Sequence, residues 1–248
     1  MNVAQETSIV YRLGDIEFGI TNASQDLKAA LQQLFESSES SPHEVRLLEE
    51  STDIRAVVNS LLSRYCDCIW IDAASLICPG GKRLIISGNS GTGKSTTALA
   101  LVYGNGWKLL SEDITLIDHS RDKIISFPSP FSLKVGTAER VKSACGVSPG
   151  PLIHNEWVRV PNDLIAASTD AGFDIVIHFA KNTERRPLSC TPISEVEYVR
   201  LILECSNLIH MDEAPDLMVK YTKGAARYLL NGGTLAERLE FIQSLVQN

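Results

Sequence analysis

The chain has 248 residues, of which 44% are hydrophobic and 21% are charged, and its formal net charge is −7. This length and composition are sufficient for a hydrophobic core that needs neither disulfides nor a structural metal. The acidic balance disfavours nucleic acid as a partner, because binding to a phosphate backbone requires a basic face.

The first predicted elements form an α+β subdomain over residues 1–66. Alternating apolar residues over 8–20 predict a strand or hairpin, and apolar residues at helical spacing over 22–36 predict a short helix. Residues 37–42, with the sequence SSESSP, have the composition of a linker. A second helix is predicted over 53–65, where Ile, Val and Leu recur on one stripe.

The remaining residues, 67–248, are predicted to form a P-loop kinase-like domain, unless the chain is one continuous domain, 1–248. Two adjacent strands are predicted from the apolar runs 66–77 and 83–87. The segment Pro79-Gly80-Gly81 between these runs is typical of a tight turn. The second strand therefore leads directly into the glycine-rich segment that follows it.

This glycine-rich segment satisfies the pattern G-x-x-x-x-G-K-[ST], the Walker A or P-loop motif. Glycines let the backbone wrap closely around an anion, and the helix predicted over 94–103 adds the positive end of its dipole. Lys94 is expected to reach the β- and γ-phosphates of ATP, and the Ser95 hydroxyl is expected to ligate Mg²⁺. The predicted nucleotide-binding residues are Gly88, Asn89, Ser90, Gly91, Thr92, Gly93, Lys94, Ser95 and Thr96.

An acidic pair, Glu112-Asp113, follows the next predicted strand, residues 107–110. One helix and one turn separate this strand from Ser95, so we expect it to return beside the P-loop strand. The pair would then lie at the edge where open α/β sheets bind ligands. Adjacent carboxylates on extended backbone point in different directions, which favours one as a Mg²⁺ ligand and the other as a base. The alternative is a solvated strand end or a helix cap.

The C-terminal half contains weaker signals. A hairpin is predicted over 114–126, residues 127–162 are rich in loops, a buried strand covers 173–179, and 194–248 is mostly helical. Four basic residues are candidate stabilisers of a transferring phosphoryl group, with ordinary surface charge as the alternative. These are Lys134, Arg159, Arg185 and Arg186.

The segments GNSGTGKSTTALAL and LLSEDITLI, with a G-x-W strand between them, resemble the catalytic domain of HPr kinase/phosphorylase and its shorter relatives. The resemblance extends loosely over residues 68–205, and FPSPFSLK at 127–134 is similar to a proline-bearing segment of the shorter relatives. It implies an α/β fold, with a P-loop kinase-like mixed sheet and flanking helices. It also implies ATP and Mg²⁺ as cofactors and is compatible with a homo-oligomer.

Carried over from this family, Glu112 would be the base acting on a serine hydroxyl and Asp113 would join Ser95 as a Mg²⁺ ligand. Lys94, Glu112 and Asp113 are thus the candidate catalytic residues. The chain departs from the family at two positions, since an aspartate is usual at Glu112 and a histidine is common at Asp72. The family's histidine is linked to phosphorolysis, so its replacement argues against phosphorylase activity. The longer members' signature after the acidic pair is not recognisable, which argues against HPr itself as the substrate.

The predicted activity is that of a phosphotransferase, an ATP-dependent kinase that transfers the γ-phosphoryl group to a serine-type hydroxyl on a peptide or protein. A small-molecule kinase is an alternative within the same class. A regulatory module that binds ATP without catalysis is an alternative from another class. The acidic pair favours the kinase. The aspartate at position 72, where the family often has a histidine, leaves the regulatory module as an alternative.

The surroundings of the protein are also predicted from the sequence. No basic segment followed by an apolar one begins the chain, and no apolar run approaches the ~20 residues that span a bilayer. We therefore expect a cytoplasmic protein without a membrane partner.

Overall fold

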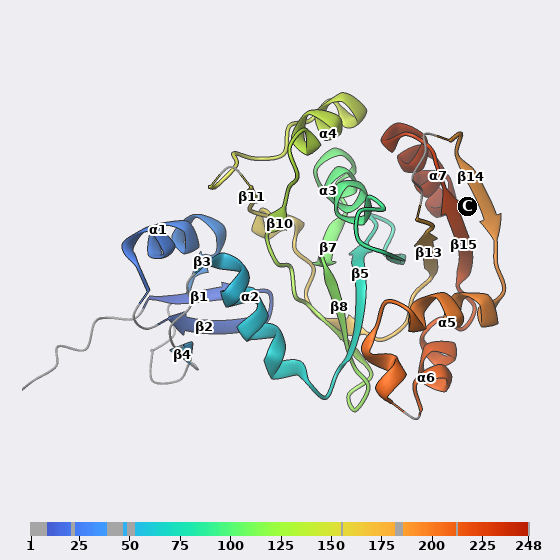
Figure 1. The fold of residues 1–248 in the computed structure, drawn as a ribbon, viewed down its shortest axis with the longest axis horizontal. Coiled ribbons are helices and arrows are strands. Elements are labelled where there is room, and N and C mark those ends of the chain that lie inside the picture. Colours follow the sequence, from blue (N-terminus) through green and yellow to red (C-terminus); the bar gives the residue numbers. More distant parts are fainter. Residues whose placement is uncertain are drawn as a thin grey trace, which may run out of the picture.

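A computed structural model describes residues 9–20, 23–38, 47–48, 53–154, 156–181, 186–211 and 213–247 (Figure 1). Its α-helices are α1 Gln25–Leu34, α2 Ile54–Leu62, α3 Lys94–Asn105, α4 Thr137–Cys145, α5 Glu195–Leu203, α6 Ala214–Tyr221 and α7 Leu235–Gln247. The main-sheet strands are β5 Ile69–Ile77, β6 Arg83–Gly88, β7 Lys108–Ser111, β8 Ile114–Asp118, β9 Lys123–Ile125, β12 Thr169–Asp170, β13 Ile175–Phe179, β14 Ser189–Pro192 and β15 Ala226–Asn231.

The main sheet mixes parallel and antiparallel strand pairs. Its order is β12-β9-β8-β5-β6-β13-β15-β14, and β7 pairs with β5 beside this path. Strands β6, β13 and β15 are parallel, whereas β5 runs antiparallel to β6, β7 and β8. The predicted α/β class with a mixed sheet and flanking helices is therefore confirmed.

Hydrophobic clusters cover both faces of this sheet. Successive side chains of a strand point to opposite faces, so Leu84 and Ile86 of β6 pack in one cluster and Ile85 packs in the other. The first cluster takes in α3, α4 and α7, and the second takes in α5 and α6 (Figure 1). Helix α3, which follows the glycine-rich segment, is thereby packed against the sheet on its buried side.

A smaller sheet lies near the N-terminus. Its strands are β1 Val10–Leu13, β2 Ile16–Ile20, β3 Glu36–Ser37 and β4 Leu47–Leu48, in the order β3-β1-β2-β4. The hairpin of β1 and β2 and the helix α1 confirm the predictions for 8–20 and 22–36. Both helices of this part begin at a capped residue, because Ser24 accepts from the amide of Leu27 and Asp53 accepts from the amide of Ala56.

One further hydrophobic cluster joins the N-terminal part to the main sheet. Phe18, Leu31 and Leu61 belong to it, together with Leu116 and Phe127. Residues on both sides of position 66 thus share one cluster. The division into domains 1–66 and 67–248 stays a prediction.

Several segments contain elements that the sequence pattern did not predict, among them β12 and β14. The loop-rich region 127–162 contains α4 and two short strands, β10 Phe131–Ser132 and β11 Trp157–Val158. Helix α4 was missed because only Thr137 and Val141 are buried on it, so its apolar stripe is weak. Strand β15 lies in the predicted helical region, and its partly exposed sequence ARYLLN does not alternate. The predicted linker 37–42 begins inside β3, and most of it lies outside the described residues.

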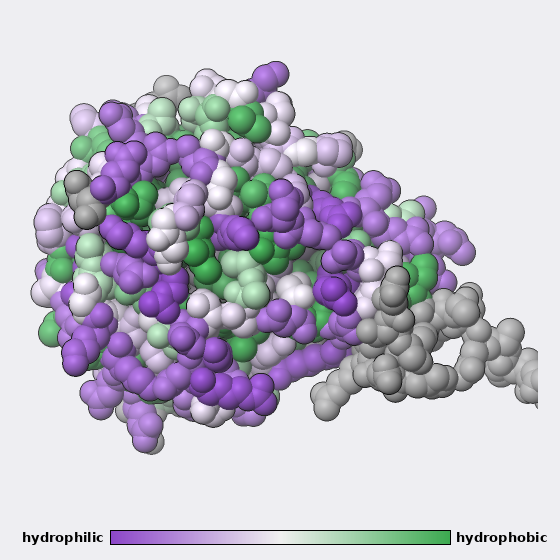
Figure 2. Space-filling view, turned by 180° about the vertical axis from the view of Figure 1, so that it is seen from behind, coloured by the Kyte–Doolittle hydropathy of each residue, from purple (hydrophilic) through white to green (hydrophobic). Residues whose placement is uncertain are grey.

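The surface is mixed in polarity. Figure 2 shows hydrophilic residues along the lower edge of the rear face and hydrophobic ones dispersed among hydrophilic ones elsewhere. The exposed large hydrophobic residues are spread along the chain, and they are Ile9, Val135, Val147, Leu152, Val196 and Val219. Within the ranges that the structure describes, the helices are too short or too polar for any of them to cross a bilayer.

Gly14→Ala is expected to lower the free energy of unfolding by ~1–3 kcal/mol more than Gly146→Ala. Both glycines have positive φ, at 60° and 74°, so both substitutions introduce backbone strain. A Cβ at Gly14 would also lie 2.5 Å from the carbonyl oxygen of Ser126, whereas a Cβ at Gly146 meets nothing within 4 Å. Urea denaturation of the two variants measures the difference, and equal losses would contradict this packing of the hairpin turn.

Candidate nucleotide-binding site

The segment between β6 and α3 has a backbone that requires glycine. Gly88, Gly91 and Gly93 have φ values of 138°, 85° and 102°. A Cβ at Gly88 would lie 2.5 Å from the carbonyl oxygen of Phe179 on the neighbouring strand β13. The strand-loop-helix context that the motif demands is therefore present. Asn89 and Ser90 form its exposed tip, and Thr96 lies partly buried in the first turn of α3.

Lys94 is held inside this loop. Its side chain is 6% exposed, and its Nζ donates to the carbonyl oxygen of Gly88 at 2.6 Å and pairs with Oδ1 of Asp72 at 2.8 Å. The helix it begins has Gly93 as its N-cap, which supplies no side-chain acceptor to the first-turn amides. An uncapped helix start beside a buried ammonium group is a favourable place for an anion.

The outer side of the loop is braced by Arg238 of α7. Its guanidinium donates to the carbonyl oxygens of Thr92 at 2.8 Å and Gly232 at 2.9 Å. It also lies 4.7 Å from the centroid of the Phe179 ring, a cation–π distance. Within the loop, Thr92 Oγ1 donates to the carbonyl oxygen of Asn89 at 2.8 Å. The C-terminal helix therefore helps to fix the conformation of the loop.

The acidic pair lies near the loop, but strand β7 does not return directly beside β6 as expected. Strand β5 lies between them, with Ser75 opposite Ser111 of β7 and Asp72 opposite Ile114 of β8. Between these two residue pairs the chain does not pair with β5, and this short connection between β7 and β8 contains Glu112 and Asp113. The amide of Ala73 donates to the carbonyl oxygen of Asp113 at 3.0 Å, which holds the connection between β7 and β8 to β5.

Three buried hydroxyl groups lie next to this connection, on β5, β7 and β8. Ser75 Oγ and Ser111 Oγ lie 2.6 Å apart, and Ser111 Oγ lies 3.1 Å from Thr115 Oγ1. Thr115 Oγ1 in turn donates to the carbonyl oxygen of Ala73 at 3.0 Å. Because the three hydroxyls satisfy one another inside the sheet, β7 and β8 are held to β5 on either side of the acidic pair.

Glu112 and Asp113 have different environments. Glu112 is 5% exposed, and burial raises its pKa to about 8, with further increases from the charges of Asp113 and Asp72. A hydrogen bond with the side chain of Ser95 and the charge of Lys94 lower the pKa of Glu112 in part. Asp113 is an exposed residue, yet protein atoms around its carboxylate and the charge of Asp72 raise its pKa.

The donor set at the loop suits Mg²⁺. The Ser95 hydroxyl and the carboxylates of Asp113, Glu112 and Asp72 are hard oxygen ligands. Among the described residues, no group of three or more His, Cys, Asp or Glu side chains is arranged as a complete metal site. Mg²⁺ in phosphoryl-transfer sites is held by one or two carboxylates together with substrate phosphates, and the residues present fit that requirement.

The basic candidates separate into three groups. Arg186 lies in the wall of a cavity next to the loop. Lys134 is exposed before α4, and Arg159 donates to Oδ1 of Asn162 at 3.3 Å. Arg185 lies outside the described residues. The predicted roles of these residues in charge stabilisation stay predictions.

Three residues near the site did not emerge from the motif. Asp72 was noted only as a departure from the family, although a charged residue inside an apolar strand is itself a signal. Arg238 is distant in sequence from Thr92, so no local pattern connects them. Arg55 of α2 lowers the pKa of Asp113 through its charge and donates to Oε1 of Glu156 at 2.9 Å.

No protein-family model and no curated protein matches the sequence. Among solved structures, the chain is similar to the HPr(Ser) kinase/phosphatase from Coxiella burnetii, with 16% identity and a TM-score of 0.36. The match covers 72% of this chain and 94% of that chain. Because the TM-score and the identity are this low, we infer nothing about function from the match.

In the metal-free protein, Glu112→Gln is expected to raise the free energy of unfolding by ~1–3 kcal/mol at pH 8 and to change it little at pH 5. The pKa of Glu112 in the folded protein lies above its ordinary value of 4.5, so the wild type loses stability as pH rises from there towards about 8. Glutamine carries no charge that burial would penalise. Urea denaturation in the presence of a chelator measures both values.

The control for this prediction is Glu240→Gln, which removes an exposed carboxylate from α7. It is expected to have no comparable pH-dependent effect. Equal stability of Glu112→Gln and the wild type at both pH values would show that Glu112 is not desolvated in the folded protein.

Proposed function

We propose that this protein is an ATP-dependent kinase that transfers the γ-phosphoryl group to a serine-type hydroxyl. The observation that carries the proposal is the position of Lys94, which contacts the glycine-rich loop through Gly88 and an acidic cluster through Asp72. Glu112 lies close to the same groups, since the charges of Lys94 and Asp72 both act on its pKa. A phosphate-binding loop next to carboxylates is the arrangement that phosphoryl transfer to a hydroxyl requires.

In this proposal each residue of the loop has a role in holding ATP. The residues Gly88 to Thr96 surround the phosphates, and Lys94 contacts the β- and γ-phosphates. Ser95 and Asp113 would hold Mg²⁺, which neutralises negative charge on the phosphates when it is bound. Because Lys94 is already fixed by the Gly88 carbonyl, its ammonium group is positioned before ATP arrives.

Glu112 is the proposed base. In its ionised form, which the charge of Lys94 favours, its carboxylate accepts the proton of the acceptor hydroxyl while the hydroxyl oxygen forms a bond to the γ-phosphorus. The bond between that phosphorus and the bridging oxygen of ADP breaks, so the products are a phosphate ester and ADP. The Ser95 side chain, which is proposed to hold Mg²⁺, lowers the pKa of the Glu112 carboxyl group, so the proposed base and the proposed metal ligand lie close together.

The acceptor is proposed to approach from the N-terminal part of the chain. A cavity of about 460 Å³ lies between the starts of α1 and α2 and the residues His154, Glu156 and Trp157. Its wall includes Asp53, Arg55 and Trp157, and the charge of Arg55 acts on Asp113. A peptide, a protein segment or a small molecule bearing a hydroxyl would thereby enter on the side of the acidic pair.

A non-catalytic ATP-binding module is the second candidate, and two observations favour it. Asp72 neutralises Lys94 with an ion pair at 2.8 Å, so phosphate must compete with a carboxylate for the lysine. The burial of Glu112 also limits its access to an acceptor. A module of this kind would bind ATP and transfer no phosphate.

Glu112→Ala is expected to leave ATP binding intact and to reduce phosphoryl transfer by ~100-fold or more, because a positioned base is lost. The acceptor is first identified by mass spectrometry of whatever gains label from γ-labelled ATP and Mg²⁺ in a lysate. Transfer rates to it are then measured for the wild type, Glu112→Ala and the exposed-carboxylate control Glu240→Ala.

Unchanged transfer in Glu112→Ala would remove Glu112 from the role of base. ATP binding by the wild type without transfer to any component of the lysate would favour the regulatory module. Lys94→Ala should weaken ATP binding under both hypotheses, so it tests the nucleotide site alone.

A further inference from the structure

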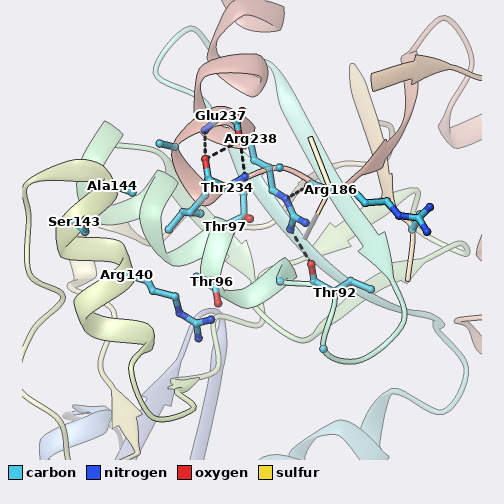
Figure 3. Close-up of a pocket in the computed structure, with 17 residues that line it drawn as sticks. Thr92, Thr96, Thr97, Arg140, Ser143, Ala144, Arg186, Thr234, Glu237 and Arg238 are labelled. Carbon is cyan, nitrogen blue, oxygen red and sulfur yellow. Dashed lines mark hydrogen bonds between the residues drawn. The ribbon is translucent and has the colours of Figure 1, made fainter. Parts of the chain in front are cut away.

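A cavity of about 750 Å³ opens on the side of the phosphate-binding loop that faces α4 and α7. The loop contributes Gly91, Thr92 and Gly93 to its wall, and the first turns of α3 contribute Thr96 and Thr97. Figure 3 shows Arg140 and Ser143 of α4 across from Thr234 and Arg238, with α3 between the two groups. The cavity is thus continuous with the loop and has a volume typical of small-molecule sites.

The direction of a bound triphosphate follows from the positions of Lys94 and Ser95. Lys94 contacts Asp72, and Ser95 contacts Glu112, so the reacting end of the triphosphate lies on the side of the carboxylates. The non-reacting end must leave the loop on another side. The cavity adjoins the loop at Gly91, Thr92 and Gly93, where Arg238 donates to the Thr92 carbonyl oxygen, and Asp72, Glu112 and Asp113 do not line it.

The wall of the cavity has the chemistry that a base and a ribose require. Ala144, Ala180 and Leu235 supply apolar surface, and the guanidinium of Arg140 is a plane on which an aromatic base can stack. Arg140 is itself oriented within α4, since it donates to Thr137 Oγ1 at 3.0 Å and to the carbonyl oxygen of Gly136 at 3.2 Å. These groups can contact a flat ring system on its face and along its edge.

Thr97 provides a second, independent indication of a ligand. Its side chain is fully buried, it lines the cavity, and its Oγ1 has no hydrogen-bond partner within the described part of the chain. A buried hydroxyl without a partner costs free energy, on the order of 1–3 kcal/mol. A ligand hydroxyl or ring nitrogen in the cavity would satisfy it.

We propose that this cavity binds the nucleoside part of the triphosphate, with its base against Arg140 of α4 and its polar groups near Thr97. The proposal rests on the proposed function and adds to it the part of the substrate that the phosphate-binding motif does not address. Helix α4 then selects a nucleotide over a simple polyphosphate. Helix α4 and the start of α7 form walls of the cavity, so the triphosphate would bind in one orientation, with its nucleoside in the cavity.

The test compares the binding of ATP and of sodium tripolyphosphate, each with Mg²⁺, by isothermal titration calorimetry of the full chain. The variant Ser143→Trp fills the cavity from an exposed position of α4, so the fold tolerates it. The matched control is Lys142→Trp, the preceding exposed residue, which does not line the cavity. Circular dichroism verifies that both variants fold.

The wild type is expected to bind ATP at least ~10-fold more tightly than tripolyphosphate, because only ATP fills the cavity. Ser143→Trp is expected to remove that advantage and to leave tripolyphosphate affinity unchanged, whereas Lys142→Trp changes neither. Equal affinities in the wild type, or an unaltered ATP affinity in Ser143→Trp, would overturn the nucleoside site while leaving the phosphate site intact. Failure of both ligands to bind the wild type would instead overturn the proposed function.

Discussion

The buried ammonium group of Lys94 is the constraint on which the site depends. A charge that is 6% exposed must be compensated, and here the Gly88 carbonyl and the Asp72 carboxylate compensate it at 2.6 and 2.8 Å. These contacts set the distance between the loop and strand β5. An arriving phosphate would share or replace the negative charge of Asp72, so the ion pair is both a support for the empty loop and a competitor for its ligand.

The arrangement of the sheet around β5 brings the remaining carboxylates to the same place. Strands β7 and β8 pair with successive parts of β5, and the chain between them carries Glu112 and Asp113 away from the sheet. Asp72 lies on β5 at that level, so the fold places three acidic residues near one lysine. Their mutual repulsion is reflected in the raised pKa of Glu112, which burial raises first and neighbouring charges raise further.

The sequence predicts the local parts of this site well and its long-range contacts poorly. The loop at 88–93 is predictable because its backbone conformation requires glycine at Gly88, Gly91 and Gly93. Apolar periodicity predicts β6, α3 and the hairpin of β8 and β9. Strand order is not local, which is why β5 was not expected between β6 and β7. Arg238 and α4 were missed for the same reason, because Arg238 contacts the loop and α4 packs against α3 and α7, and no local sequence pattern predicts these long-range contacts.

A crystal structure with a non-hydrolysable ATP analogue and Mg²⁺ tests the central claim most directly. We expect the β- and γ-phosphates within the loop at 88–95, with Lys94 contacting them and Mg²⁺ contacting Ser95 and Asp113. The terminal phosphate should lie on the side of Glu112 and the nucleoside on the side of α4. A loop without nucleotide at saturating analogue, or a terminal phosphate remote from Glu112 and Asp113, would contradict the interpretation of this site as a kinase centre.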